Sequence, residues 1–343
     1  MRRHGASRIR DHLAALVGHP IPFTNWSYPL YTLPLFWPLA QLPYFWALAV
    51  WTVGLFSVFA ALVLSQIESS QRLAALLVLV LAPACLINTV AGQCGVLGAT
   101  LMIGGILSID RRPVVAGLLF GLLAFKPQMA VVIPFALLAL GAWRVMLVAT
   151  VTVLALLAMS IAMFGLDAWR HYFEVNAGYL VAAQQEFQAS FKIMMASVFA
   201  AGRTFGLSYA AGLALQGAVA MITIAVACWT VRRTDDPRQR AFVLVTAAPL
   251  VTPYAFNYDL VGMAAVLVWM LFGQLRLRSE WSGVCFLAWI APIAMMYLNS
   301  MGLGVMPLAL MGLFVMSVVT TVQTPWQPLA AARNRPLPHP VAF

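Results

Sequence analysis

The sequence predicts an all-α, polytopic integral membrane protein with about ten or eleven transmembrane helices. Of its 343 residues, 63% are hydrophobic and 9% are charged, whereas globular domains carry about 25% charged residues. The mean hydropathy is +0.90. Apolar stretches long enough to approach the roughly 20 residues that cross a bilayer recur along the whole chain. These features exclude a soluble fold.

Residues 1–43 are expected to precede the membrane domain. Prolines are frequent in residues 21–43, which should form an irregular or interfacial helical approach, and their Trp and Tyr side chains suit the membrane interface. Four arginines in residues 1–28 would lie outside the cell if the first span, 44–67, runs inward. This arrangement violates the positive-inside rule. We therefore expect either that residues 28–43 are a further crossing or that the native chain begins earlier, with a helix that precedes this sequence. In the second case, residues 1–43 are the remnant of a first extracytoplasmic loop and a proline-rich interfacial segment.

Residues 44–323 are the predicted multi-helix transmembrane domain. Its apolar stretches are 44–67, 73–93, 95–109, 114–125 joined to 129–143, 145–165, 208–231, 241–256, 260–275, 283–298 and 302–320. Arginines fall in short connections that alternate along the chain: Arg72, Arg111, Arg112, Arg144, Arg232, Arg233, Arg238, Arg240, Arg276, Arg278, Arg333 and Arg335. Short loops rich in arginine face the cytoplasm. The net charge of +10 is therefore interpreted as a topology signal and not as a nucleic-acid surface.

The remaining segments complete the predicted topology. Residues 166–207, whose charges sum to zero, form one long extracytoplasmic loop, and the proline-rich residues 324–343 form a disordered cytoplasmic tail. Four cysteines lie within or beside apolar stretches without the spacing of a metal site. They are Cys85, Cys94, Cys228 and Cys285. We expect them to be small core residues.

Lys126 is the first candidate functional residue, because an ionisable side chain at membrane depth is a functional hypothesis by default. The helix-breaking Pro127 follows it. A broken helix frees backbone N–H groups beside the lysine, and this combination suits a phosphate. The alternative is a lysine at a span end that extends to the outer interface.

Three further polar places are candidates. Asp259 ends the polar, aromatic break 252–259, where it could bind an acceptor hydroxyl or a sugar, or simply cap the next helix. Gln93 ends the polar segment 88–93 and could bind a sugar, although an interfacial helix end is an alternative. Arg203, in the outer loop, could supply a second cation for a lipid phosphate, or could anchor the loop to headgroups. Lys126, Asp259 and Gln93 all open to the same predicted outer face.

Several short motifs occur in a fixed order along most of the chain. They are Tyr28-Pro29, Leu39-Ala40-Gln41-Leu42-Pro43-Tyr44, Gly92-Gln93, Asp110-Arg111-Arg112-Pro113 with Ala116-Gly117, Gly121-Leu122, Lys126-Pro127-Gln128, and Thr252-Pro253-Tyr254 with Tyr258-Asp259. In this order the chain resembles glycosyltransferase family 87, whose members are alpha-1,2-mannosyltransferase-like membrane proteins. The resemblance implies a glycosyltransferase C-type fold and a polyprenyl-phosphate-linked hexose donor, typically mannose. It also implies an active site on the outer face of the cytoplasmic (inner) membrane, with a lipid or glycan as acceptor.

The implied inverting transfer needs a carboxylate to take the acceptor's proton and a cation to hold the departing phosphate. Lys126 and Arg203 are the expected phosphate ligands, and Asp259 is the candidate base. The side chains expected to bind the sugar or the acceptor are Gln93, Gln128, Tyr258 and Tyr28. No metal or other cofactor is expected, and the partners are the lipid-linked donor, the acceptor and membrane lipids, with no nucleic acid.

One part of the family pattern is missing. The family's base is an aspartate in the first outer loop, and residues 1–28 resemble only the end of that loop. The expected explanations are, in order, a start codon assigned too late, a truncated and inactive product, or another carboxylate such as Asp259 acting as base. A secondary transporter or flippase, with Pro127 and Pro253 in two broken helices, is the alternative from a different functional class. A structural membrane subunit is a third.

Overall fold

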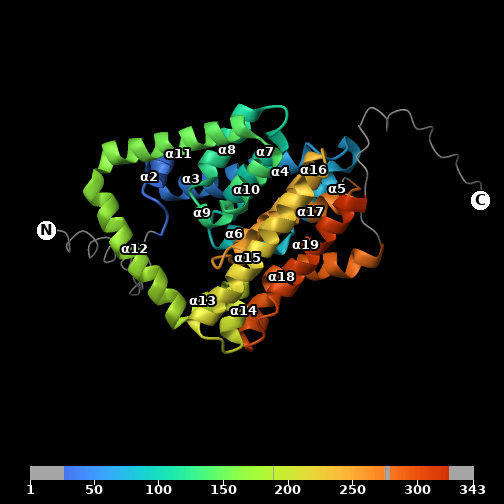
Figure 1. Ribbon diagram of the computed structural model, residues 1–343. Coiled ribbons are helices and arrows are strands. Elements are labelled where there is room, and N and C mark those ends of the chain that lie inside the picture. Colours follow the sequence, from blue (N-terminus) through green and yellow to red (C-terminus); the bar gives the residue numbers. More distant parts are fainter. Residues whose placement is uncertain (1–26, 188, 274, 276–278, 324–343) are drawn as a thin grey trace, which may run out of the picture.

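The computed structural model describes residues 27–323 except 188, 274 and 276–278, and within these residues every regular element is a helix. The one pairing of extended residues there is an isolated bridge between Met195 and Phe256. Figure 1 shows shorter helices packed together, with longer helices along the edges of the molecule. The predicted all-α membrane class is confirmed. The predicted tail 324–343 and residues 1–26 lie outside the described residues.

The first half of the chain consists of short and interrupted helices. They are α2 (Thr32–Ala40), α3 (Tyr44–Ala49), the π-helix η1 (Val50–Gly54), α4 (Leu55–Leu64), the 3₁₀-helix η2 (Ser69–Gln71), α5 (Arg72–Val80), α6 (Pro83–Val90), α7 (Gly95–Ser108), α8 (Pro113–Leu123), α9 (Pro127–Ala130) and α10 (Val132–Leu140). Proline opens α6, α8 and α9, at the position where its missing N–H has no intrahelical acceptor to lose. Pro83 and Pro127 therefore divide apolar stretches into separate helices, whereas Pro113 starts α8 after the charged residues 110–112.

The second half contains the longer helices. They are α11 (Trp143–Phe164), α12 (Leu166–Glu186), α13 (Ala189–Met194), α14 (Val198–Thr204), α15 (Tyr209–Val231), α16 (Pro237–Val251), the 3₁₀-helix η3 (Asn257–Leu260), α17 (Val261–Leu271), the 3₁₀-helix η4 (Ser279–Trp281), α18 (Ser282–Ser300) and α19 (Met306–Gln323). Residues 166–207, expected as a loop, thus contain α12, α13 and α14.

Among the described residues, five helical runs are long and apolar enough to cross a bilayer: Tyr44–Leu64, Trp143–Phe164, Tyr209–Val231, Ser279–Ser300 and Met306–Gln323. A sixth crossing is possible where Ser69–Val80 and Pro83–Val90 meet at a bend of 56°. Four further apolar helices are shorter: Gly95–Ser108, Pro113–Leu123, Pro127–Leu140 and Asn257–Leu271. The chain is therefore a multi-pass membrane protein in which many of the expected spans are interrupted.

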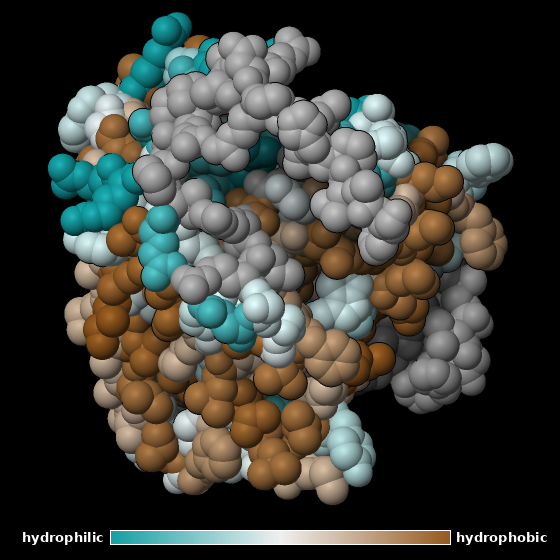
Figure 2. Space-filling model, turned by 90° about the vertical axis from the view of Figure 1, so that its right-hand side faces the viewer, coloured by the Kyte–Doolittle hydropathy of each residue, from teal (hydrophilic) through white to brown (hydrophobic). Residues whose placement is uncertain are grey.

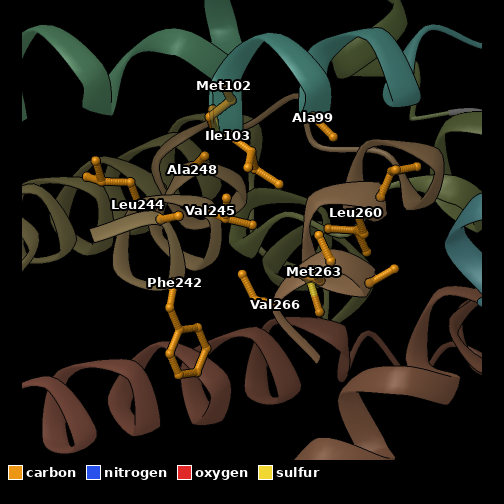
Figure 3. Close-up of a cluster of buried hydrophobic side chains, with 14 of the residues drawn as sticks. Ala99, Met102, Ile103, Phe242, Leu244, Val245, Ala248, Leu260, Met263 and Val266 are labelled. Atoms are coloured by element: carbon orange, nitrogen blue, oxygen red, sulfur yellow. The ribbon is translucent and has the colours of Figure 1, made fainter. Parts of the chain in front are cut away.

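The centre of the molecule is formed by α7, α16 and α17. Every residue from Gln239 to Val251 of α16 and from Val261 to Met270 of α17 is buried. Figure 3 shows side chains of all three helices meeting there. A β-carbon at Gly262 would lie 2.9 Å from Val245 Cγ1, so the glycine permits the close approach of α17 to α16. Helices that are apolar on all sides belong in such an interior.

Two glycines one helical turn apart bring α8 against α11. A β-carbon at Gly117 would lie 2.5 Å from Val148 Cβ, and one at Gly121 would lie 2.4 Å from Thr152 Cβ. This Gly-x-x-x-Gly spacing is typical of close helix packing in membranes, where small residues let backbones approach. In Figure 1, α11 runs along the top of the molecule and α12 along its left side, and α13 and α14 lie at the bottom.

The predicted cytoplasmic arginines that the structure describes lie at or beside helix ends. Six of these are exposed, namely Arg72, Arg111, Arg112, Arg144, Arg232 and Arg233. Arg240 is buried and donates to both carboxylate oxygens of Asp110, at 2.9 and 2.7 Å, which ties the α7–α8 connection to the start of α16. Figure 2 shows the side of the molecule where the labels of α5 and α16 lie in Figure 1, with hydrophilic residues gathered in its upper part above a hydrophobic surface.

Candidate functional site

Three breaks between helices meet at one buried place. The first is the α8–α9 junction at Lys126, the second is η3 after α16, and the third is the connection from α6 to α7 that contains Gln93 and Cys94. Residues 126 and 259 are 133 positions apart in the chain, yet Lys126 Nζ donates to Asp259 Oδ1. The convergence of these segments, expected from the sequence, is therefore present in the fold.

Lys126 and Asp259 form a buried ion pair whose side chains are 4% and 1% exposed. Lys126 Nζ also lies 3.7 Å from Cys94 Sγ and 4.9 Å from the centroid of the Tyr258 ring. Lys126 therefore does not extend to the protein surface, and the alternative of an interfacial lysine is wrong. A buried pair is costly to desolvate, and removing one partner leaves an uncompensated charge.

Asp259 also has a local structural role. Its Oδ2 accepts a hydrogen bond from the backbone N–H of Phe256 at 3.2 Å, so the carboxylate caps the turn η3, as one interpretation of the sequence held. The rings of Phe256 and Tyr258 stack at 5.2 Å with an angle of 4° between them. The cap and the stack hold Asp259 and Tyr258 in fixed positions beside Lys126.

Tyr28 closes one side of the site. Its hydroxyl lies 3.0 Å from Cys94 Sγ, and its ring lies 6.1 Å from that of Phe125. Burial raises the pKa of the Tyr28 phenol above its usual value, so the hydroxyl stays neutral. Tyr31, three residues on, donates to the carbonyl oxygen of Ala124 at 2.7 Å. The segment before α2 is thus fastened across the α8–α9 break.

Cys94 is a site neighbour that sequence reasoning placed only in the core. It is buried, as expected, but its sulfur also contacts both Lys126 and Tyr28. Its position directly after Gln93 was the one available signal. Gln93 and Gln128 are half-buried. Gln93 directly precedes Cys94, which contacts Lys126, and Gln128 lies two residues after Lys126.

Asn88 holds the third break in place. Its Oδ1 accepts from the backbone N–H groups of Gly95 at 2.7 Å and Val96 at 3.3 Å, the first two residues of α7. Early N–H groups of a helix have no intrahelical acceptor, so Asn88 acts as a remote cap. Gln93 and Cys94 lie in the loop that these bonds close.

Replacing Asn88 by alanine is expected to destabilise the protein by about 1–2 kcal/mol, because two buried N–H groups lose their acceptor. Asn88→Asp keeps an oxygen at the same position, next to a helix N-terminus that favours negative charge. The midpoint of thermal unfolding in detergent measures both variants. Equal losses in the two variants would show that these hydrogen bonds do not stabilise the site.

The space beside the ion pair is small. A cavity of about 30 Å³ is lined by Cys94, Gly95, Lys126, Asp259 and ten further residues, mostly apolar. That volume holds a water molecule but not a sugar. A sugar-sized ligand therefore needs more room beside Lys126 than this cavity offers.

Arg203 lies outside this group of contacts. It belongs to α14 and donates to the carbonyl oxygens of Leu207 and Gln185, both at 2.9 Å, with Phe187 under its guanidinium at 5.8 Å. Its buried Nε has no hydrogen-bond partner among the described residues. In the described part of the chain no hydrogen bond or ion pair joins Arg203 to Lys126 or Asp259. Its role as a phosphate ligand stays a prediction.

Metal ligands were not expected at this site. Among the described residues there is no group of three or more His, Cys, Asp or Glu side chains that could hold a metal ion. The metal-free expectation itself stays a prediction.

Comparison with known proteins adds one finding. The family model described as "Glycosyltransferase family 87" matches residues 26–253. The match includes Tyr28, Gln93, Lys126, Gln128 and Arg203 and ends before Tyr258 and Asp259. No curated protein and no solved structure matches the chain.

Proposed function

Because the chain belongs to glycosyltransferase family 87, we propose that this membrane glycosyltransferase moves a hexose, mannose in the first instance, from a polyprenyl-phosphate donor to a lipid or glycan acceptor. The reaction inverts the anomeric centre and takes place on the outer face of the cytoplasmic membrane. The observation that carries the proposal is the buried Lys126–Asp259 pair at the meeting point of three helix breaks.

The charges of the pair suit transfer from a lipid phosphodiester. Before reaction, the lysine carries one positive charge, and the aspartate and the phosphodiester one negative charge each. As the acceptor oxygen attacks the anomeric carbon, the bond from that carbon to the phosphate oxygen breaks, and the acceptor's proton passes to Asp259. Polyprenyl phosphate then leaves with its additional negative charge beside Lys126. As Asp259 is neutralised, the departing phosphate gains negative charge, so the attraction between Lys126 and the phosphate grows as the reaction proceeds.

The other predicted residues take supporting roles in this proposal. In the proposal, Gln93, Gln128, Tyr258 and Tyr28 bind the sugar or the acceptor, because they offer the hydroxyl, amide and aromatic groups that sugars contact. Arg203 is the second phosphate ligand if donor binding draws α14 toward the site. Two protein cations would make a divalent metal unnecessary.

Purified full-length protein in nanodiscs, supplied with polyprenyl-phosphate mannose and a mixture of lipid and glycan acceptors, is expected to release polyprenyl phosphate and form a mannoside of inverted configuration. Mass spectrometry measures the released lipid phosphate, and NMR measures the anomeric configuration. GDP-mannose serves as the control donor, from which no product is expected. Turnover of GDP-mannose would contradict the proposed donor class, and mannoside with retained configuration would contradict the mechanism. Movement of the lipid-linked sugar across a sealed bilayer without transfer would instead indicate the transporter alternative.

A further inference from the structure

A second charged cavity lies at the far end of α15, away from Lys126. Arg232 and Arg233 follow the last residue of this helix directly. Together with Trp229, Cys228 and Ala139 they line a cavity of about 680 Å³. Ala139 belongs to α10, so the cavity lies where two apolar helices meet at the arginine-rich end of the molecule.

No carboxylate of the described residues pairs with the positive charges at this cavity. The carboxylates that follow along the chain are engaged elsewhere, because Asp236 pairs with Arg238 and Asp235 with Arg240. Within the described ranges no ion pair involves Arg232 or Arg233, and both side chains are exposed. Two adjacent cations without counter-charges favour an anion in the cavity that they line.

Arg233 is held in place for such an anion. Its Nη1 donates to the carbonyl oxygen of Trp229 at 2.9 Å, and its guanidinium carbon lies 3.6 Å from the centre of the Trp229 ring. Stacking on an aromatic ring fixes the guanidinium plane while leaving its edge available, and that edge matches the geometry of a phosphate.

We propose that Arg232, Arg233 and Trp229 bind the phosphate headgroup of an anionic phospholipid. The surroundings favour a lipid over a free phosphate, because the two helices that line the cavity carry exposed apolar side chains along their length: Phe135 and Leu138 on α10, and Met221 and Ile222 on α15. Acyl chains can cover these side chains while the headgroup meets the arginines. The positive-inside rule places this end in the cytoplasmic leaflet, where anionic lipids concentrate. The site is independent of the proposed transfer reaction.

The test uses full-length protein in detergent, titrated with phosphatidylglycerol and followed by native mass spectrometry. Arg232→Gln/Arg233→Gln is expected to weaken phosphatidylglycerol binding about tenfold or more, because charge-assisted hydrogen bonds to phosphate are lost. The matched control is Arg111→Gln/Arg112→Gln, which removes another exposed arginine pair that does not line this cavity and lies at the same predicted side. Trp229→Phe, which keeps a ring under Arg233, should weaken binding less than Trp229→Ala.

Three outcomes would overturn the proposal. The first is that Arg232→Gln/Arg233→Gln binds phosphatidylglycerol as tightly as the unmodified protein. The second is that the control Arg111→Gln/Arg112→Gln loses as much affinity as this double variant. The third is that inorganic phosphate at the same concentration displaces the lipid completely, which would identify a free-anion site. A thermal unfolding midpoint unchanged in Arg232→Gln/Arg233→Gln confirms that the measured difference does not come from misfolding.

Discussion

Lys126→Gln is expected to slow hexose transfer by about 10²- to 10³-fold, the loss that follows removal of one preorganised group facing a developing negative charge. The glutamine is close in size but carries no charge to attract the departing phosphate. It also leaves Asp259 buried without its cation, which is expected to destabilise the protein by about 3–5 kcal/mol. Release of polyprenyl phosphate and the unfolding midpoint measure the two effects. Lys192→Gln, at the other lysine of the sequence, should change neither greatly.

A double variant separates catalysis from stability. Lys126→Met/Asp259→Leu replaces both charges by apolar groups of similar volume, and such replacements are often neutral or stabilising. We expect this protein to fold and to be inactive. The exchanged pair Lys126→Asp/Asp259→Lys gives the opposite test, because it keeps the ion pair but moves the cation. Restored transfer in the exchanged pair, or activity in the apolar one, would show that the pair only stabilises the fold.

Among substitutions that add a single methyl group in the site, Gly95→Ala is expected to destabilise the protein most. A β-carbon at this position would lie 1.9 Å from the carbonyl oxygen of Tyr258 and 2.8 Å from Asn88 Oδ1. Because the first contact is with backbone, α7 and η3 must separate, and Asp259 moves with η3. The expected destabilisation is about 3 kcal/mol, at the upper end of the usual cost of overpacking, together with a large loss of transfer.

Gly217→Ala is the matched control for this substitution. Gly217 lies inside α15, and beyond its own helix and chain neighbours no atom stands within 4 Å of the place that an added methyl group would take. Alanine favours a helix over glycine, so this variant should be as stable as the unmodified protein or slightly more so. Similar unfolding midpoints for Gly95→Ala and Gly217→Ala would show that the close approach of Gly95 to Tyr258 is not required.

The membrane class could be predicted because it depends on composition alone. Stretches such as 44–67 and 145–165 have no charged side chain, and their burial in lipid requires helices with internally paired backbones. Their interruptions were harder to predict. The bend of 56° between α5 and α6 separates two halves that hydropathy predicts as one apolar stretch, 73–93. Hydropathy reports the preferred depth of residues in the membrane and not the direction of the helix.

The limits of hydropathy also explain why the helices in residues 166–207 were not predicted. Their charges and low hydropathy predicted a loop, but these residues contain α12, α13 and α14. A helix satisfies its backbone hydrogen bonds locally, whether its side chains are apolar or polar. Membrane hydropathy therefore could not distinguish a polar helix from an irregular loop here.

The sequence by itself determined which groups are available for chemistry: Lys126 and Asp259 stand out because charges in apolar surroundings are costly. Only the tertiary structure decided that they form a pair, that Cys94 joins them, and that Arg203 is held by carbonyl oxygens elsewhere. The cost of an isolated charge is a property of one residue and its neighbours in the chain. Its neutralisation depends on contacts between residues more than a hundred positions apart, which the packing of α7, α16 and α17 establishes.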